Sequence, residues 1–259
     1  MWTRKELKGK AKEIVKKSYW KVVLVSLIMI LISGGLGAGS SYRYGSNEAS
    51  SKTQSVIEDT TGNIVLQNEV HAKPSAALIA GIVVGVLIAL TIFMAVGIVI
   101  NAFVINPLLT GIRRFFSHEL KDSTKVREVA FAFDHSYMNV VKTMFFRDLY
   151  TFFWSLLLII PGIVKGYEYR MIPYLLGDDP EMSKEEAFAR SKEMMNGQKW
   201  NAFVLDLSFI GWNILSLFTL GLLSVFYVAP YENLTHAALY NRLAGKDLDP
   251  IDVYPALEE

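Results

Sequence analysis

The residues best suited to chemistry in this sequence are ionisable side chains that lie within apolar stretches. Each interrupts a run of residues that is otherwise apolar and long enough to enter a bilayer. Charged groups at such positions usually face the interior of a helix bundle, where they pair with one another or mark a path for protons or a substrate. The six candidates for an intramembrane charge cluster are Arg147, Asp148, Glu168, Arg170, Asp206 and Glu232.

Other sources of chemistry are scarce. The chain has no cysteine, which excludes disulfides, thiolate metal sites and cysteine nucleophiles. The pair Glu232 and His236, four residues apart, is only a weak metal signal. HExxH, GxSxG and phosphate-loop patterns are absent, and a net charge of +1 gives no sign of nucleic acid binding. We therefore predict no cofactor, no metal and no catalytic residue, although sequence alone leaves an intramembrane enzyme open.

The apolar stretches predict an integral membrane protein. Residues 76–105 contain no charge, and a bilayer core of ~30 Å needs only ~20 helical residues. The first apolar stretch, residues 22–38, could be read as a signal peptide followed by a small-residue cleavage site. However, the region before it is amphipathic and contains Glu6 and Glu13, which favours an uncleaved first span.

The stretch IIPGIVKGYEYRMIPYLL, residues 159–176, decides between two topologies. If residues 165–200 form one outer loop, the chain has four spans and six cations outside. If the chain turns at Pro161-Gly162 and returns by Leu176, it has six spans and places 21 of its 26 cations on the cytoplasmic side. Because cytoplasmic loops carry the excess of lysine and arginine, the six-span arrangement is favoured.

We therefore predict an all-α, polytopic helix bundle that forms a single integral membrane domain, residues 1–259. Six transmembrane helices form three hairpins, each preceded by an interfacial amphipathic helix, with both termini in the cytoplasm of a multi-pass cell membrane protein. The predicted segments are a basic interfacial helix (1–21), span 1 (22–38), an outer loop (39–74), span 2 (75–106), a cytoplasmic segment (107–139), span 3 (140–160), span 4 (162–177), a cytoplasmic amphipathic helix (183–196), span 5 (200–218), span 6 (221–242) and a cytoplasmic tail (243–259).

The basic N-terminal segment predicts contact with membrane lipids. Between Arg4 and Tyr19, Leu7, Ala11, Ile14, Val15 and Ser18 share one helical stripe, and lysines cover the rest. This pattern is typical of a helix on an anionic inner leaflet, although a soluble basic tail would show it too.

Three short segments resemble one another and indicate an internal repeat. SYWKVVLV (18–25), SYMNVVKT (136–143) and QKWNAFVL (198–205) each join an amphipathic basic segment to a span. In each case the return helix of the following hairpin carries a proline, Pro107, Pro173 or Pro230. We interpret this as three copies of one unit, with chance similarity between membrane interfaces as the alternative.

The depth of the charges predicts specific partners. Counted from the expected turns and anchors, Arg170, Asp206 and Glu232 converge near the middle of a ~30 Å core. We expect Arg170 to pair with Asp206 or Glu232, and Asp148 to pair with Arg147 or to join the cluster. Such pairs would either fix the order of the helices or form part of a proton or substrate path.

Four blocks of the sequence resemble a known family. MWTRKELKGKAKEIVKKSYWKVVLV, NPLLTGIRRFF, the long block from FFRDLYTFFW to LDLSFIGW, and APYENLTHAALY are similar to the bacterial membrane family catalogued as domain of unknown function 975. The resemblance implies a bacterial integral membrane protein and supplies no activity. The long block also looks distantly like the membrane domain attached to some glycerophosphodiester phosphodiesterases, although we expect no counterpart of their catalytic domain in this sequence.

Two functions fit these observations. The first is a non-enzymatic membrane scaffold, lipid-interacting or accessory protein, whose partners are anionic lipids and either other membrane proteins or further copies of itself. The second is a small transporter or lipid-moving protein that uses the intramembrane charges within short spans interrupted by proline and glycine.

Overall fold

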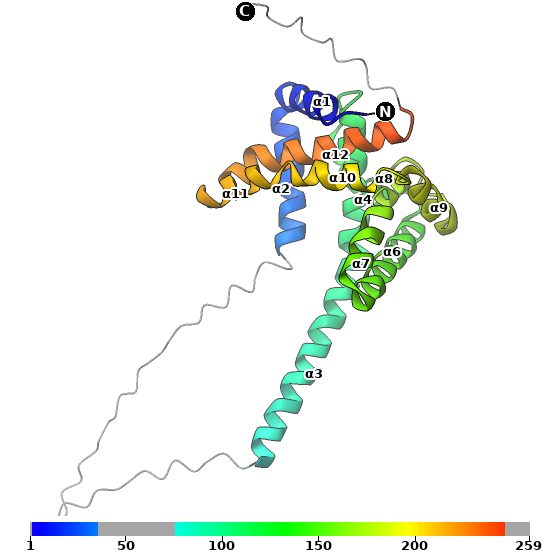
Figure 1. The fold of residues 1–259 in the computed structure, drawn as a ribbon. Coiled ribbons are helices and arrows are strands. Elements are labelled where there is room, and N and C mark those ends of the chain that lie inside the picture. The colour runs from blue at the N-terminus through cyan, green and yellow to red at the C-terminus, as the bar shows by residue number, and fades with distance from the viewer. Residues whose placement is uncertain (1, 36–75, 247–259) are drawn as a thin grey trace, which may run out of the picture. The chain divides into compact units, whose positions relative to one another are not determined.

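The computed structural model describes residues 2–35 and 76–246, and every regular element in these ranges is a helix (Figure 1). The predicted all-α class is confirmed for this part of the chain. Two helical stretches, Ala80–Glu119 and Lys199–Phe218, are long and apolar enough to cross a membrane, and 0% and 22% of the residues in their most apolar parts are buried. The predicted outer loop and most of the cytoplasmic tail lie outside the described residues.

The chain forms two compact units, residues 1–37 with 97–259, and residues 38–96. What is described of the second unit is most of helix α3 (Ala76–Ile100), whose side chains from Ile82 to Val96 are exposed. A helix that is apolar all round needs an apolar environment on every side.

The N-terminal helix begins with a cap that satisfies its free backbone groups. In α1 (Arg4–Lys17) the Thr3 hydroxyl accepts a hydrogen bond from the Glu6 N–H at 3.2 Å, and the Glu6 carboxylate accepts one from the Thr3 N–H at 3.4 Å. This reciprocal arrangement fixes where the helix starts. Helix α2 (Tyr19–Gly35) follows directly after Ser18.

The apolar stripe of α1 differs in its role from the sequence prediction. Leu7, Ala11 and Ile14 are buried against the protein, because α1 packs along α12 (Ala229–Leu243). Val15 of the same stripe is also buried, so the apolar residues of the stripe contribute to the core of the protein. Exposed lysines such as Lys12 and Lys16 cover the opposite side.

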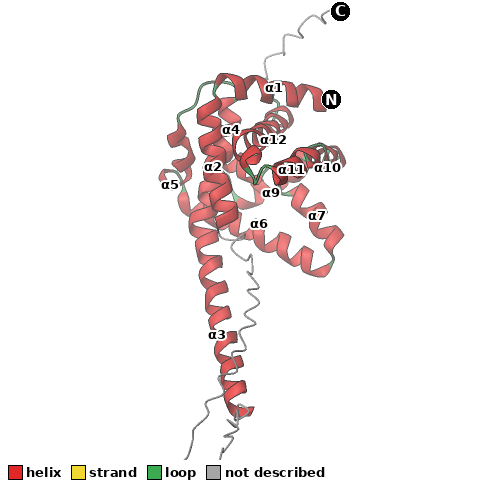
Figure 2. Ribbon diagram, turned by 90° about the vertical axis from the view of Figure 1, so that its left-hand side faces the viewer, coloured by secondary structure: helices red, strands yellow, loops and turns green. Residues whose placement is uncertain are grey.

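The second predicted hairpin is present, but its turn lies earlier than expected. Helices α6 (Tyr137–Leu157) and α7 (Ile159–Glu168) lie side by side and are separated only by Leu158, whose backbone is extended (Figure 2). Pro161 is accommodated in the first turn of α7, where its missing N–H removes no hydrogen bond. Gly162 is needed for the close approach, because a Cβ there would lie 2.3 Å from the Ser155 Oγ atom.

Predicted spans 4 and 5 are each broken into two helices rather than continuous. The chain leaves the α-helix at residues 169–171, within predicted span 4, and again at Ser208-Phe209, within predicted span 5. The cytoplasmic amphipathic helix between them is present, and Ser183 caps it by accepting a hydrogen bond from the Glu186 N–H. These elements are α8 (Ile172–Asp178), α9 (Lys184–Met194), α10 (Lys199–Leu207) and α11 (Ile210–Phe218).

A distortion of the helix comes immediately before each of the three prolines of the predicted repeat. The π-helix η1 (Asn101–Ile105) precedes Pro107, and the π-helix η3 (Ser224–Val228) precedes Pro230. The break at residues 169–171 precedes Pro173. Proline cannot donate to the carbonyl four residues earlier and its ring collides with it, so an α-helix must widen or break at this point.

The three entry segments of the predicted repeat contact these distortions in a cyclic order. The Tyr137 hydroxyl donates to the Phe103 carbonyl at 2.6 Å, and the Tyr19 hydroxyl donates to the Phe226 carbonyl at 3.1 Å. Both acceptors lie four residues before a proline, so tyrosine satisfies the carbonyl that proline leaves free. In the third segment, Lys199 stands at the tyrosine position and binds the Glu168 carboxylate beside the break.

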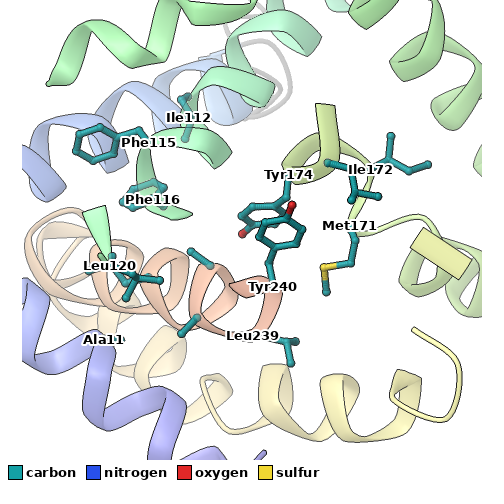
Figure 3. Packing of buried hydrophobic residues seen from close by; sticks show 14 of the residues in the cluster. Ala11, Ile112, Phe115, Phe116, Leu120, Met171, Ile172, Tyr174, Leu239 and Tyr240 are labelled. Carbon is teal, nitrogen blue, oxygen red and sulfur yellow. The ribbon is translucent and has the colours of Figure 1, made fainter. Parts of the chain in front are cut away.

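The buried core of the first unit is built around helix α4 (Asn106–Glu119). Helix α4 packs against α8, α12 and the short helices η2 (Val126–Ala130) and α5 (Phe131–Asp134). Tyr174 of α8 and Tyr240 of α12 stack at its centre, with ring centroids 4.7 Å apart, as Figure 3 shows. This core fixes α8 and α12 relative to each other and thereby positions the charged groups described next.

Candidate functional site

Arg170 lies at the break between α7 and α8, and its guanidinium binds the Asp206 carboxylate of α10. The Nη1 atom donates to Oδ2 at 2.8 Å and the Nη2 atom donates to Oδ1 at 3.0 Å. Both side chains are largely buried, with 19% and 29% of their surface exposed. The structure therefore contains the predicted partner of Arg170 in a bidentate geometry, which is the strongest form of this contact.

Asp206 has two further partners that the sequence analysis did not assign to it. The Tyr167 hydroxyl donates to Oδ2 at 2.8 Å, and His236 Nε2 lies 2.9 Å from Oδ1. Because an ionised carboxylate only accepts hydrogen bonds, this contact requires the tautomer of the buried His236 that carries a proton on Nε2 and donates it to Oδ1. The only signal for His236 was its spacing of four residues from Glu232. We call Asp206, Arg170, Tyr167 and His236 the Asp206 centre.

Glu168 forms a second, separate centre. Only 4% of this residue is exposed, and its carboxylate binds Lys165 at 2.8 Å and Lys199 at 2.7 Å. Lys165 is one turn away on the same helix, whereas Lys199 comes from the beginning of α10. A buried carboxylate held by two ammonium groups is compensated for the loss of water, and it fastens α7 to α10.

Arg147 and Asp148 form the third centre, on α6. The Arg147 Nε and Nη2 atoms donate to Oδ1 of Asp148 at 3.0 and 2.5 Å. The other carboxylate oxygen, Oδ2, accepts a hydrogen bond from the Asn106 amide at 2.8 Å. The predicted partner of Asp148 is thus present, and Asn106 links the pair to the start of α4.

Five of the six predicted residues therefore fall into three separate groups rather than one cluster. Glu232, the remaining candidate, is half-buried on α12 and belongs to no ion pair among the described residues. Arg170 selects Asp206 because the break before α8 and the entry of α10 bring the two side chains together. Helix breaks of this kind change the depth and direction of a side chain, which residue counting along an ideal helix does not include.

A fourth charged group, centred on Asp178, was not predicted. It lies at the end of α8 and outside the predicted spans. Its carboxylate binds His118 at 3.4 Å, Lys246 at 2.5 Å and the Tyr240 hydroxyl. Burial opposes ionisation of this carboxyl, but the hydrogen bonds from His118, Lys246 and Tyr240 outweigh it and lower its pKa to about 2.

Each of these centres joins a carboxylate to several charged or polar partners. In the described part of the chain, no three histidine, aspartate or glutamate side chains are placed to share a metal ion. Asp206, Glu168 and Asp178 each bind at least two cations or hydrogen-bond donors. These contacts link α4 with α6 and α8, link α7 with α10, and link α12 with α8 and α10.

Comparison with known proteins yields a family but no activity. No curated protein and no solved structure matches this chain. The resemblance to the membrane domains of phosphodiesterases is therefore not supported by any named relative. A family model described as a protein of unknown function, DUF975, matches residues 50–247, which is more than half of the sequence. The chain belongs to the DUF975 family of proteins of unknown function.

Proposed function

We propose that this protein is a non-enzymatic, multi-pass protein of the cell membrane that binds lipids and serves as a scaffold or accessory for other membrane proteins. In this proposal the chain crosses the membrane six times and both termini are cytoplasmic. The second candidate, a small lipid transporter, is kept because two of the expected spans are broken near paired charges, as in transporters with discontinuous helices.

The observation that carries the proposal is the exposure of apolar side chains at two helix tips. At the α6–α7 turn, Leu156 and Ile159 are 73% and 76% exposed. At the end of α11, Phe218 and Leu220 are 79% and 95% exposed. Apolar tips of this kind are unfavourable in water, since each Å² of apolar surface costs about 25 cal/mol relative to burial. Lipid would remove this cost.

The paired charges support a structural role over catalysis. In the described residues, the carboxylates of Glu168 and Asp206 are bound by arginine, lysine, histidine or tyrosine, whereas half-buried Glu232 forms no ion pair. An enzyme site would require a nucleophile or base with its partner beside an open position. Buried ion pairs, in contrast, fix which helices are neighbours.

The topology is testable because the chain has no cysteine of its own. Single cysteines at Leu158, Leu220 and Lys125 would be treated in intact cells with a maleimide that does not cross membranes. Leu158→Cys and Leu220→Cys should react, whereas Lys125→Cys should react only after the cells are opened. Reaction of Lys125→Cys in intact cells, or protection of Leu158→Cys until lysis, would contradict the six-span arrangement.

The function is testable with the full chain in bilayers of phosphatidylglycerol and phosphatidylcholine. Native mass spectrometry after release from nanodiscs should show retained lipid. In liposomes that contain a fluorescent lipid, the protein should leave the rate of transbilayer movement unchanged. Faster transbilayer movement of the lipid would contradict the scaffold function and favour the transporter. Release of a water-soluble headgroup would contradict it and favour an enzyme.

A further inference from the structure

A cleft of about 430 Å³ opens between α4, α6, α7 and α8, beside the Asp206 centre. Its lining contains three guanidinium groups, those of Arg113, Arg147 and Arg170, and a single carboxylate, that of Asp148. Asp206, which binds Arg170, is not part of the lining. The groups that line this space therefore carry an excess of positive charge.

Arg113 is the residue that sets this cleft apart. Among the described residues it forms no ion pair, and its Nη1 atom donates only to neutral groups, the Tyr174 hydroxyl at 3.3 Å and Asn233 Oδ1 at 3.1 Å. Its neighbour Arg114 binds the Glu128 carboxylate at 2.8 Å. A half-buried guanidinium that has no ion-pair partner among the described residues can form a strong contact with a ligand that supplies an anion.

The other two guanidinium groups keep donors available. Arg170 uses Nη1 and Nη2 on Asp206, and Arg147 uses Nε and Nη2 on Asp148. The Nε atom of Arg170, the Nη1 atom of Arg147 and the Nε and Nη2 atoms of Arg113 make no hydrogen bond to the described residues. The planar arginine fork matches the oxygens of a phosphate group.

The cleft also has an apolar side. Phe152, which lines it, is 60% exposed, and Leu109 and Pro173 lie in the same lining. Phe152 belongs to the helix whose tip we expect to contact lipid, so the cleft adjoins the proposed lipid surface. Charge at one side and apolar surface at the other suit a molecule with a phosphate and acyl chains.

We propose that this cleft binds the phosphate of an anionic lipid headgroup, with Arg113 as its principal contact and with Arg147 and Arg170 as further donors. This inference rests on the proposed function, since it gives the lipid-binding protein a specific site. The shared chemistry is a phosphate anion, which a lipid or free phosphate could supply.

The test compares two arginine variants of the full chain purified in a neutral detergent. Arg113→Gln removes the charge without leaving a carboxylate unpaired, so the fold should be retained. Arg127→Gln is the matched control, because Arg127 is exposed and does not line the cleft. Binding of phosphatidylglycerol and phosphatidylcholine is measured by native mass spectrometry, and binding of inorganic phosphate alone by the shift in unfolding temperature.

We expect the wild-type protein to prefer phosphatidylglycerol over phosphatidylcholine. Arg113→Gln should weaken phosphatidylglycerol binding by about tenfold or more, as expected for a lost charged hydrogen bond, and Arg127→Gln should leave it unchanged. Arg113→Lys should give an intermediate affinity, and this variant replaces Arg113→Gln as the probe if the glutamine protein unfolds. Inorganic phosphate should bind far more weakly, because it lacks the acyl chains.

Three results overturn the inference. Equal loss in Arg113→Gln and Arg127→Gln means that general surface charge attracts the lipid. Unchanged binding in Arg113→Gln means that lipid sits elsewhere, which leaves the proposed lipid-binding function intact. Tight binding of inorganic phosphate that depends on Arg113 and excludes phosphatidylglycerol identifies a soluble anion as the ligand and overturns the lipid assignment. Accelerated lipid movement in liposomes, in contrast, overturns the scaffold function without affecting the site.

Discussion

Replacing Arg170 with leucine should destabilise this protein more than any loss of a surface ion pair. The substitution removes two charged hydrogen bonds, at 2.8 and 3.0 Å, and leaves Asp206 buried with only Tyr167 and His236 as donors. Each such bond contributes about 1.5–3 kcal/mol, and breaking a buried pair from one side costs about 3–5 kcal/mol. Because both side chains keep some exposure, we expect Arg170→Leu to lower the free energy of unfolding by about 3 kcal/mol.

This energy corresponds to a measurable change in unfolding temperature. For a chain of this size, 1 kcal/mol shifts the midpoint by about 2–4 °C, so Arg170→Leu should lower it by roughly 6–12 °C in detergent. The double variant, Arg170→Leu with Asp206→Leu, should recover about half of the loss, since no charge is left unpaired. Recovery should be incomplete because Tyr167 and His236 lose their acceptor.

The matched control is Arg190→Leu on α9. Arg190 binds Glu186 at 3.1 Å, but both side chains are about half exposed. Its loss should cost less than about 1 kcal/mol, as is usual for surface pairs. The reasoning is refuted if Arg170→Leu shifts the midpoint no more than Arg190→Leu does, or if the double variant is less stable than both single variants.

Three further predictions follow from the packing and the charges. Gly162→Leu should separate α6 from α7 and reduce the yield of folded protein, whereas Gly211→Leu, at a glycine with open space around it, should not; expression followed by size-exclusion chromatography measures both. Leu7→Asp should lower the unfolding temperature by several degrees, because Leu7 is buried against the protein rather than facing lipid; an unchanged midpoint would show that α1 is a passive tail. The pKa of Asp178 is lowered to about 2, below the unfolded value of about 3.9, so its contribution to stability is present above pH ~4 and is lost as the pH falls toward 2. Asp178→Asn should therefore remove this part of the acid sensitivity of the unfolding temperature. Asp179→Asn, at the exposed neighbour, should not change it.

The ion pairs that could be predicted from the sequence were those in which a charged residue had few possible partners. A charge within a long apolar stretch must find a partner of opposite sign, and Arg170 had only two acids at a similar depth. Depth is set by distance along a helix, which the sequence supplies. The residues that were missed, Tyr167, His236 and Lys199, are polar groups that several environments would tolerate, so nothing in their spacing identified their partners.

The sequence by itself determined the all-α class, the apolar stretches, the cap at Ser183 and the three prolines of the repeat, because these depend on local physics: helix periodicity, backbone capping and the missing N–H of proline. Only the tertiary structure decided that α1 covers the protein core, that two of the expected spans break, and that the charges form separate centres. These outcomes depend on which helix faces meet, and an apolar stripe or a carboxylate is satisfied equally by lipid, water or another helix until the fold selects one. The cleft beside Arg113 also depends on the tertiary structure. Its three arginines, Arg113, Arg147 and Arg170, are 23 to 57 positions apart in the sequence and meet only through the packing of α4, α6 and α8.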